Sequence, residues 1–267
     1  MVRSMGKDTR QAGHRRKLIN NKERVGHKHG REGPLQQVLI KHKFEVRENS
    51  GAVSGLLLRP AAADCLLVFG HGAGAGMRHP FMEEAAGRLA ERGIATFRYQ
   101  FPYMEQGHRR PDHQSILLKT VRSAVTKVVT LSGGLPLWAG GRSMGGRMTS
   151  LTASQSPLDE IRGLIFFGFP FHPAGKPSVK RAEHLKKVEL PMLFLQGTRD
   201  RLAKLEIPQL ICDELPDTAT LSLIEGADHS FNVLKRSGRT NDEVLNELAS
   251  RVRAWIDMKT KDGQCIG

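Results

Sequence analysis

From Leu35 onward, short apolar runs alternate with segments whose apolar residues recur at helical spacing. Continuous runs such as Cys65 to Phe69 and Met192 to Gln196 are typical of strands buried on both faces of a parallel sheet. Between them, Ser115 to Val129 places its apolar side chains on one helical stripe. This alternation predicts βαβ units, and therefore an α/β domain built around a mostly parallel sheet.

The same pattern predicts the remaining elements. Further strands are expected at Val38–Val46, Val53–Leu58, Ile94–Tyr99, Leu137–Ala139, Gly163–Phe169 and Thr220–Ile224. Further helices are expected near Pro80, from Met144, around Leu205–Glu214 and over Asn241–Ile256, and a long loop at Gln100–Asp112. Because a Glu48–Gly51 turn separates the first two strands, we expect them to form an antiparallel pair at one edge of the sheet.

The N-terminal stretch Met1 to Pro34 has a different composition. It holds ten Lys and Arg against three Asp and Glu, which is half of the chain's formal net charge of +14. With almost no apolar residues, it cannot bury enough surface to offset the entropy of ordering. We therefore predict a disordered basic tail at 1–34, a single domain at 35–260 and a flexible C-terminus at 261–267.

The tail has the charge to contact nucleic acid, but no RNA- or DNA-binding motif accompanies it. A solvated tail without a role, or a start codon assigned too far upstream, is the simpler interpretation. No run approaches the roughly 20 apolar residues of a membrane span, and the N-terminus has no apolar signal region.

The three cysteines, Cys65, Cys212 and Cys265, are far apart and lack metal-ligand spacing. Free thiols in a reducing compartment are the simplest account of them. We therefore expect a cytoplasmic protein without membrane contact, metal or cofactor. The sequence gives no indication of the oligomeric state.

The stretch Gly141-Arg142-Ser143-Met144-Gly145 matches G-x-S-x-G, the nucleophile elbow. In this motif a serine occupies a strained turn between a strand and a helix, and the flanking glycines leave room for that turn. Surface turns that contain serine give the same five-residue pattern. The other strand ends decide between the two interpretations.

In parallel sheets the chemistry collects beyond the carboxyl ends of the strands. Asp200 follows one expected strand and His229 follows the last one, so the chain order is Ser143, Asp200, His229. This is the order of the α/β-hydrolase fold. Ser143 is the expected nucleophile, His229 its base and Asp200 the acid that orients the imidazole.

The oxyanion of an acyl-transfer reaction needs two donors. The glycine-rich loop Gly70 to Gly76 follows another strand and offers unhindered backbone N–H groups. We expect the donors to be the N–H groups of Met144 and of Ala73 or its neighbour. A dinucleotide-binding loop is the alternative, but no G-x-G-x-x-G register with a downstream acid is present.

Other residues compete for these roles. Asp228 is the alternative acid, but it adjoins His229 and is expected to anchor the loop. His71 is the alternative base, but it is expected to shape the oxyanion loop. Five further histidines are interpreted as solvated or capping residues: His79, His108, His113, His172 and His184.

Substrate contacts are expected from two segments. The glycine-rich loop contributes Gly72 and Gly74. Arg98, Tyr99, Tyr103 and Met104 follow a central strand, where they are expected to line the acyl pocket. For Tyr99, as for Phe101, packing in the core is the alternative.

Five segments together resemble a known family: GHGAGAGMRHPFM (Gly70 to Met82), RYQFPYM (Arg98 to Met104), GGRSMGGR (Gly140 to Arg147), LQGTRD (Leu195 to Asp200) and GADHSF (Gly226 to Phe231). The family is the α/β-hydrolase superfamily, in its dienelactone-hydrolase-like branch. Within that branch, the chain is most similar to the small hydrolases grouped with the testis-expressed-30 and NSL-complex-subunit-3 proteins.

The resemblance implies the α/β-hydrolase fold: a twisted, mostly parallel sheet of the eight-stranded type, helices on both faces and a minimal cap. It also implies a Ser143–Asp200–His229 triad with an oxyanion hole at Ala73 and Met144. Dienelactone hydrolases proper use a cysteine where this chain has Ser143, so their substrate is not carried over. The family often continues Pro-Phe-Gly after the acid, whereas this chain reads Arg201-Leu202-Ala203.

The expected function is therefore that of a serine hydrolase, of carboxylesterase or thioesterase type, acting on a small-molecule ester, thioester or related acyl substrate. The short basic segment Gly168 to Val188 is too small for a lid domain, which predicts an open site. The alternative is a non-catalytic interaction subunit, because some members of the resembled group act as subunits of complexes.

Overall fold

The computed structural model describes residues 22–23, 37–46 and 51–264. The expected basic tail lies outside the described residues except for Lys22–Glu23, which form a short strand. Most of the expected Glu48–Gly51 turn and the last three residues of the chain also lie outside them.

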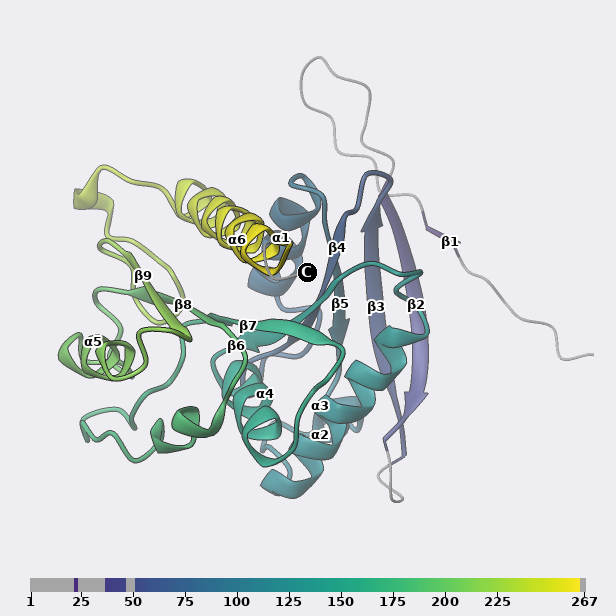
Figure 1. Ribbon diagram of the computed structural model, residues 1–267, viewed down its shortest axis with the longest axis horizontal. Coiled ribbons are helices and arrows are strands. Elements are labelled where there is room, and N and C mark those ends of the chain that lie inside the picture. The colour runs from purple at the N-terminus through teal and green to yellow at the C-terminus, as the bar shows by residue number, and fades with distance from the viewer. Residues whose placement is uncertain (1–21, 24–36, 47–50, 265–267) are drawn as a thin grey trace, which may run out of the picture.

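The described strands form one sheet (Figure 1) in the order β1-β2-β3-β5-β4-β6-β7-β8-β9. The strands β1 to β3 pair antiparallel with one another and β3 pairs antiparallel with β5, whereas all pairs from β5 to β9 are parallel. Their bounds are β1 Lys22–Glu23, β2 Gln37–Glu45, β3 Ala52–Pro60, β4 Cys65–Gly70, β5 Ile94–Tyr99, β6 Leu137–Arg142, β7 Ile161–Phe167, β8 Met192–Gly197 and β9 Ala219–Ile224. The expected antiparallel pair at one edge is confirmed.

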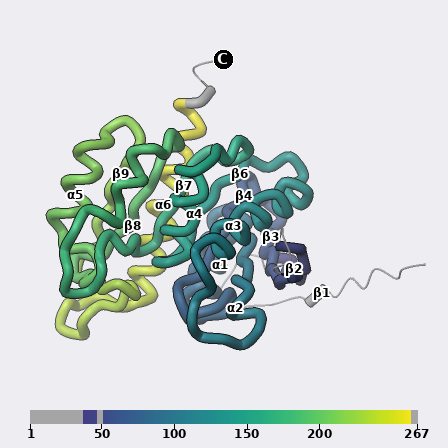
Figure 2. The backbone as a smooth tube through the Cα atoms, turned by 90° about the horizontal axis from the view of Figure 1, so that it is seen from below, coloured from purple at the N-terminus to yellow at the C-terminus, as the bar shows by residue number. Residues whose placement is uncertain are grey.

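Helices cover both faces of this sheet. Figure 1 shows α1 and α6 on one face and α3, α4 and α5 on the other. The helices are α1 Pro80–Ala90, α2 Pro102–Glu105, α3 Gln114–Val129, α4 Met144–Gln155, α5 Glu206–Asp213 and α6 Asn241–Gln264, with 3-10 turns η1 Glu183–Lys187 and η2 Lys235–Ser237. Figure 2 shows the sheet from below, with α5 near one end and β2 near the other.

The strand β4 shows how the apolar runs build this layered core. All six of its residues are buried. Leu66 and Val68 belong to the core beneath α3 and α4, whereas Cys65 and Leu67 belong to the core beneath α1 and α6. Since successive side chains of a strand point to opposite faces, an uninterrupted apolar run is what a strand between two helical layers requires.

The sheet order brings the loops of interest together. The chain goes from β4 to β5 on one side and then crosses to β6 on the other, which creates the switch point where ligands bind in open α/β sheets. Gly70 at the end of β4 pairs with Gly141 of β6. The glycine-rich loop and the Ser143 turn therefore start side by side.

Two features differ from the expected elements. The expected loop Gln100–Asp112 contains α2, which begins at Pro102 and buries Tyr103. The helix α6 runs on to Gln264, beyond the expected end at Ile256. Between β7 and β8 the only regular element is η1, so the cap is minimal. No helix of the described residues is long and apolar enough to cross a membrane.

Candidate active site

Ser143 stands between the end of β6 and the first residue of α4. Its backbone has φ 49° and ψ −114°, a conformation that costs free energy in any residue other than glycine. Two hydrogen bonds secure this conformation: the Ser143 N–H donates to Phe167 O at 3.0 Å, and its carbonyl accepts from the Arg147 N–H at 3.0 Å. The expected nucleophile elbow is thus present as a strained strand-to-helix turn.

The glycines of the elbow are needed for steric reasons. A Cβ at Gly141 would lie 2.5 Å from the Gly70 carbonyl oxygen, and one at Gly145 would lie 2.4 Å from the same atom. Such distances fall well inside van der Waals contact, so only glycine fits at either position. The two glycines of G-x-S-x-G are therefore required because the elbow packs closely against the end of β4.

The side chains of Ser143, His229 and Asp200 form one hydrogen-bonded chain. The Ser143 Oγ lies 2.9 Å from His229 Nε2, and His229 Nδ1 lies 2.7 Å from Asp200 Oδ2. Because Nδ1 faces a carboxylate, it carries the proton, and the lone pair of Nε2 faces the serine hydroxyl. This is the arrangement in which imidazole accepts a proton from serine.

A second bridge joins the elbow to the His229 loop. The guanidinium of Arg142, just before Ser143, donates to the Oγ of Ser230, just after His229, at 2.9 Å. Asp228 does not contact the His229 ring, since its Oδ1 accepts from the N–H groups of Ser230 and Asn232. These contacts support the interpretation of Asp228 as a loop anchor.

Asp200 is buried and accepts hydrogen bonds from three donors. Besides His229, these are the side-chain amide of Gln196, on Oδ2, and the Leu202 N–H, on Oδ1 at 2.7 Å. His172 secures the loop that follows, because its backbone N–H donates to Leu202 O and its Nε2 accepts from the Lys204 N–H at 2.7 Å. The residues that replace Pro-Phe-Gly in this chain thus leave Asp200 in contact with His229.

The glycine-rich loop lies against the elbow. A Cβ on Gly72 would meet the Ser143 Cβ at 3.7 Å. In the next residues, the Gly74 N–H donates to the Tyr103 hydroxyl at 3.2 Å and the Ala75 N–H to Gly72 O at 3.2 Å. Among the described residues no acceptor is found for the Ala73 N–H, and Ala73 is exposed. Since Met144 opens α4, its N–H also lacks a partner within the helix.

The segment Arg98 to Tyr103 supports this loop along its whole length. Arg98 donates to Met77 O at 3.2 Å, and Gln100 Oε1 accepts from the Met77 N–H at 2.8 Å. The Phe101 N–H donates to His71 Nε2 at 3.2 Å, and Tyr103 accepts from Gly74. This segment therefore fixes the backbone that presents the Ala73 N–H, a role that the sequence pattern did not reveal.

The structure corrects the expectation that Tyr99 and Tyr103 line a pocket. Both rings are fully buried: Tyr99 fits the core-packing alternative, and Tyr103 packs against the glycine-rich loop. Met104 is half-buried and lies against Gly76. Gly72 and Gly74 lie in the loop beside Ser143, where substrate contact stays a prediction for them and for Met104.

The other histidines fall into three groups. His79 and His113 cap α1 and α3, and His108 is exposed, as expected. His172 is buried and bonded to the acid loop, and His184 bonds Ser150 at 2.8 Å, so neither is solvated or a helix cap. Their sequence neighbours carry no pattern that would reveal such tertiary contacts.

His71 is completely buried, and both of its ring nitrogens are occupied. Its Nδ1 lies 2.8 Å from Gly72 O while Nε2 accepts from Phe101, which fixes a neutral ring. Burial lowers the pKa of His71 from its ordinary value of 6.5 to about 4. His71 is therefore a structural residue of the loop, which agrees with its expected role.

We expect the free energy of unfolding to fall as the pH drops from about 6.5 towards 4. The unfolded chain binds a proton at His71 with the ordinary pKa, whereas the folded chain resists it. The contribution of the neutral His71 ring to the free energy of unfolding is therefore complete above pH 6.5. It is lost as the pH falls through about 4, and the total loss is roughly 3 kcal/mol at most. Urea unfolding at pH 7 and pH 4.5 should show a smaller loss in His71→Gln than in the wild type. The exposed-site variant His108→Gln should retain the wild-type loss, and an equal loss in His71→Gln would contradict the prediction.

Three residues around the site were not predicted. Gln196 is a buried polar residue in an otherwise apolar strand, which is a signal that the sequence does carry. Arg142 was seen only as a neighbour of Ser143. Gly168 has φ +65°, and a Cβ added to it would lie 3.1 Å from His229 O, so glycine is favoured where this loop approaches the histidine. No group of three His, Cys, Asp or Glu suited to a metal ion exists in the described part of the chain.

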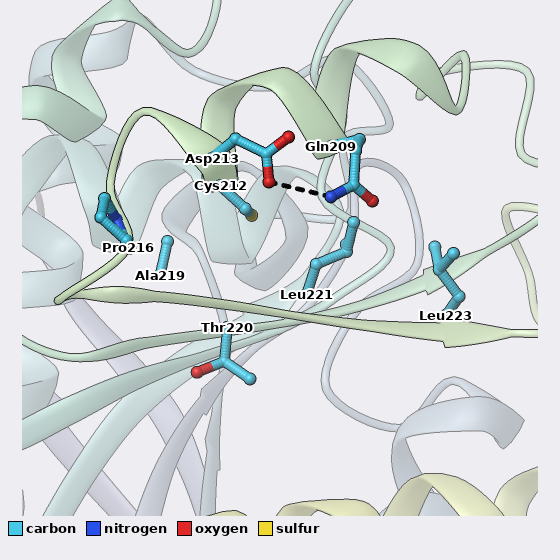
Figure 3. Close-up of a pocket in the computed structure, with 8 residues that line it drawn as sticks. All are labelled: Gln209, Cys212, Asp213, Pro216, Ala219, Thr220, Leu221 and Leu223. Atoms are coloured by element: carbon cyan, nitrogen blue, oxygen red, sulfur yellow. Dashed lines mark hydrogen bonds between the residues drawn. The ribbon is translucent and has the colours of Figure 1, made fainter.

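A pocket of about 480 Å³ lies elsewhere, between α5 and β9 (Figure 3). It is lined by Gln209, Cys212, Asp213, Pro216, Ala219, Thr220, Leu221 and Leu223, and Gln209 bonds Asp213 at 2.9 Å. It contains no base beside a nucleophile, and burial raises the pKa of the Cys212 thiol to about 12. We therefore place the candidate active site at the strand ends and not in this pocket.

A family model described as an α/β hydrolase domain matches residues 63–257, well over half of the chain. A dienelactone hydrolase from Anabaena variabilis superposes with a TM-score of 0.66 at 20% identity, over 83% of this chain and 98% of that one. A lidless α/β serine hydrolase from Xanthomonas campestris gives 0.62 at 21%, over 80% and 94%. A cold-adapted esterase from an Arctic intertidal metagenomic library gives 0.59 at 19%, over 84% and 96%.

The mostly parallel sheet, the nucleophile elbow and the strand-end acid and base define a protein of the α/β-hydrolase class, and the chain belongs to the α/β hydrolase family. Within it, the chain has the fold of the dienelactone-hydrolase-like branch, as the sequence indicated. The narrower resemblance to the testis-expressed-30 group stays a prediction.

Proposed function

We propose that this protein is a serine hydrolase that cleaves a small ester, thioester or related acyl substrate through an acyl-enzyme on Ser143. The observation that carries the proposal is the continuous hydrogen-bonded chain from the Ser143 hydroxyl through His229 to the buried Asp200. A scaffold protein has no physical need for a strained serine whose hydroxyl faces an oriented imidazole.

The proposed reaction follows from the positions of these groups. The Ser143 Oγ attacks the acyl carbon while its proton passes to His229 Nε2, and Asp200 stabilises the resulting imidazolium. The N–H groups of Ala73 and Met144 receive the oxyanion, where one donor typically contributes about 10²–10³ in rate. His229 then protonates the leaving alcohol or thiol, and water, activated by the same imidazole, releases the acid from Ser143.

The proteins of similar fold support this choice of chemistry. Two of them are described as a serine hydrolase without a lid and as a cold-adapted esterase. The short segment between β7 and β8 in this chain likewise contains only η1. An open site of this kind suits small, soluble acyl substrates better than lipid aggregates.

A fluorophosphonate probe tests the proposal directly. We expect one covalent adduct per chain, located by mass spectrometry on the peptide that contains Ser143. Heat-denatured protein should not react, because the hydroxyl is activated only when His229 adjoins it. Absence of an adduct on native protein, together with no turnover on a panel of short esters and thioesters, would favour a non-catalytic interaction subunit.

Tyr103→Phe should lower kcat about 3- to 10-fold and leave KM nearly unchanged. The variant removes the acceptor of the Gly74 N–H, and a hydrogen bond of this kind is worth on the order of 1 kcal/mol. The loss falls on kcat because the neighbouring Ala73 donor acts on the oxyanion and not on the bound ester.

The matched control is Tyr99→Phe, which removes the hydroxyl of an equally buried tyrosine whose ring does not support the Gly74 N–H. Initial rates with a short para-nitrophenyl ester give both constants for each variant. A change in KM alone for Tyr103→Phe would show that Tyr103 contacts substrate, as the sequence first indicated.

A further inference from the structure

Three arginines lie around the elbow, and their partners differ. Arg98 donates to Met77 O and forms an ion pair with Glu83 at 3.5 Å. Arg142 donates to Ser230 and lies over the ring of Phe81, 5.0 Å from its centroid. Arg147 differs from both. Its Nε is buried without a hydrogen-bond partner, and no carboxylate of the described residues lies within ion-pair distance of its guanidinium group. A half-buried charge without a counter-ion is costly.

The position of Arg147 is close to the reacting serine. It is the fourth residue of α4, and its N–H donates to Ser143 O. Side chains of a helix lean towards its N-terminus, which directs that of Arg147 towards the turn that starts at Ser143. Four residues of helix rise about 6 Å, which sets the scale of the separation.

Neither of the titratable groups that interact with Arg147, Arg181 and His184, supplies a negative charge. Burial lowers the pKa of Arg147, and the positive charge of Arg181 lowers it further. Burial and the charge of Arg147 lower the pKa of His184 to about 4, so this histidine is neutral near pH 7. His184 belongs to η1, which packs against α4 and bonds Ser150. The charges of Arg147 and Arg181 thus repel each other, and neither residue forms an ion pair with a carboxylate of the described residues.

The surrounding segment is basic throughout. Residues 169–191 carry five Lys and Arg against two Glu. One of these, Lys186, is paired with Glu214 at 2.8 Å, whereas Lys176 and Lys180 are exposed. This segment begins beside His229, because Gly168 contacts that residue, and it ends at η1 beside α4. A concentration of positive charge in the segment between β7 and β8 favours a ligand with more than one negative charge.

We propose that Arg147, with Arg181, is the phosphate subsite of this enzyme, and that the substrate is a small ester or thioester with a phosphate group a few atoms from the acyl carbonyl. The inference rests on the proposed hydrolase function. Guanidinium groups bind phosphate oxygens through two parallel hydrogen bonds, and a phosphate supplies the missing counter-ion. The reaction is hydrolysis of the acyl bond: Ser143 forms the acyl-enzyme, the phosphorylated alcohol or thiol leaves with the proton from His229, and the phosphate stays intact.

The test compares two esters that differ only in the phosphate, butyryl glycerol phosphate and butyryl glycerol. For wild type we expect the higher kcat/KM with the phosphorylated ester. In Arg147→Gln the ratio of the two kcat/KM values should fall about 10-fold or more, since hydrogen bonds to charged groups are among the strong ones. Arg147→Lys should restore part of the ratio, because it keeps the charge and loses the planar fork.

The matched control is Arg162→Gln, which removes an equal charge from an exposed position near the start of β7, whereas Ser143 lies beyond the carboxyl end of the neighbouring strand β6. Its ratio should equal that of the wild type. An unchanged ratio in Arg147→Gln, or a wild-type preference for the unphosphorylated ester, would overturn the phosphate subsite.

Binding of inorganic phosphate to Ser143→Ala, followed by calorimetry, separates this inference from the proposed function. We expect saturable binding that weakens about 10-fold in Ser143→Ala/Arg147→Gln. Phosphate binding without turnover of either ester would overturn the hydrolase and retain the subsite. Turnover with no effect of Arg147→Gln on binding or on the ratio would overturn the subsite and retain the hydrolase.

Discussion

Ser143→Ala should lower kcat for a short para-nitrophenyl ester by about 10⁴-fold or more. The substitution removes only the hydroxyl that lies 2.9 Å from His229 Nε2, and with it the covalent route. The residual rate should come from the Ala73 and Met144 donors acting on water attack. Steady-state kinetics after subtraction of the uncatalysed rate give the ratio.

The fold of the variant must be verified separately, since Ser143 has an unusual backbone conformation. Alanine tolerates φ 49° no better than serine, so the urea midpoint should change little. Turnover and fluorophosphonate labelling at wild-type levels in Ser143→Ala would show that another residue is the nucleophile.

Among Gly→Ala substitutions, Gly140→Ala should be the most destabilising and should lower the free energy of unfolding by about 3 kcal/mol or more. An added Cβ would lie 1.8 Å from Ile165 O, on the backbone of the adjacent strand β7. Backbone atoms in the centre of a sheet cannot move aside, so β6 and β7 would have to separate. Urea unfolding monitored by circular dichroism gives the change in the free energy of unfolding.

Gly87→Ala provides the opposite control. This glycine lies within α1, and an added Cβ meets nothing within 4 Å. Alanine is the better helix former, so this variant should gain about 0.5–1 kcal/mol. If both variants unfolded at the same urea concentration, the steric account of Gly140 would be wrong.

Much of the fold follows from local patterns in the sequence. The apolar runs at β4, β5 and β8 and the helical stripe of α3 lie within a residue or two of their expected bounds. These elements are buried by tertiary layers that the pattern itself requires. The sequence pattern does not predict the short helix α2, because its stability comes from the tertiary contacts of the buried Phe101 and Tyr103 and not from an apolar period along its four residues.

The site was predictable where chemistry is tied to strand ends, and not where it depends on long-range hydrogen bonds. Ser143, Asp200 and His229 lie together as their order along the chain indicated. The support of Gly74 by Tyr103 and the contact of His172 with Lys204 join residues 29 and 32 positions apart. No local periodicity encodes such contacts, which explains why Tyr103 was first assigned to a pocket.

The order of the site residues along the chain has a consequence for synthesis. The oxyanion loop, its support and Ser143 all precede residue 155, and β7, which secures the elbow, ends at Phe167, whereas Asp200 and His229 follow later, and Phe231 closes the histidine loop. Translation proceeds from the N-terminus, so a nascent chain holds its serine without an imidazole until the last part of the domain has left the ribosome. The proposed base is therefore the last of the three groups to be synthesised, and a chain that ends before residue 226 contains Ser143 and Asp200 but lacks His229.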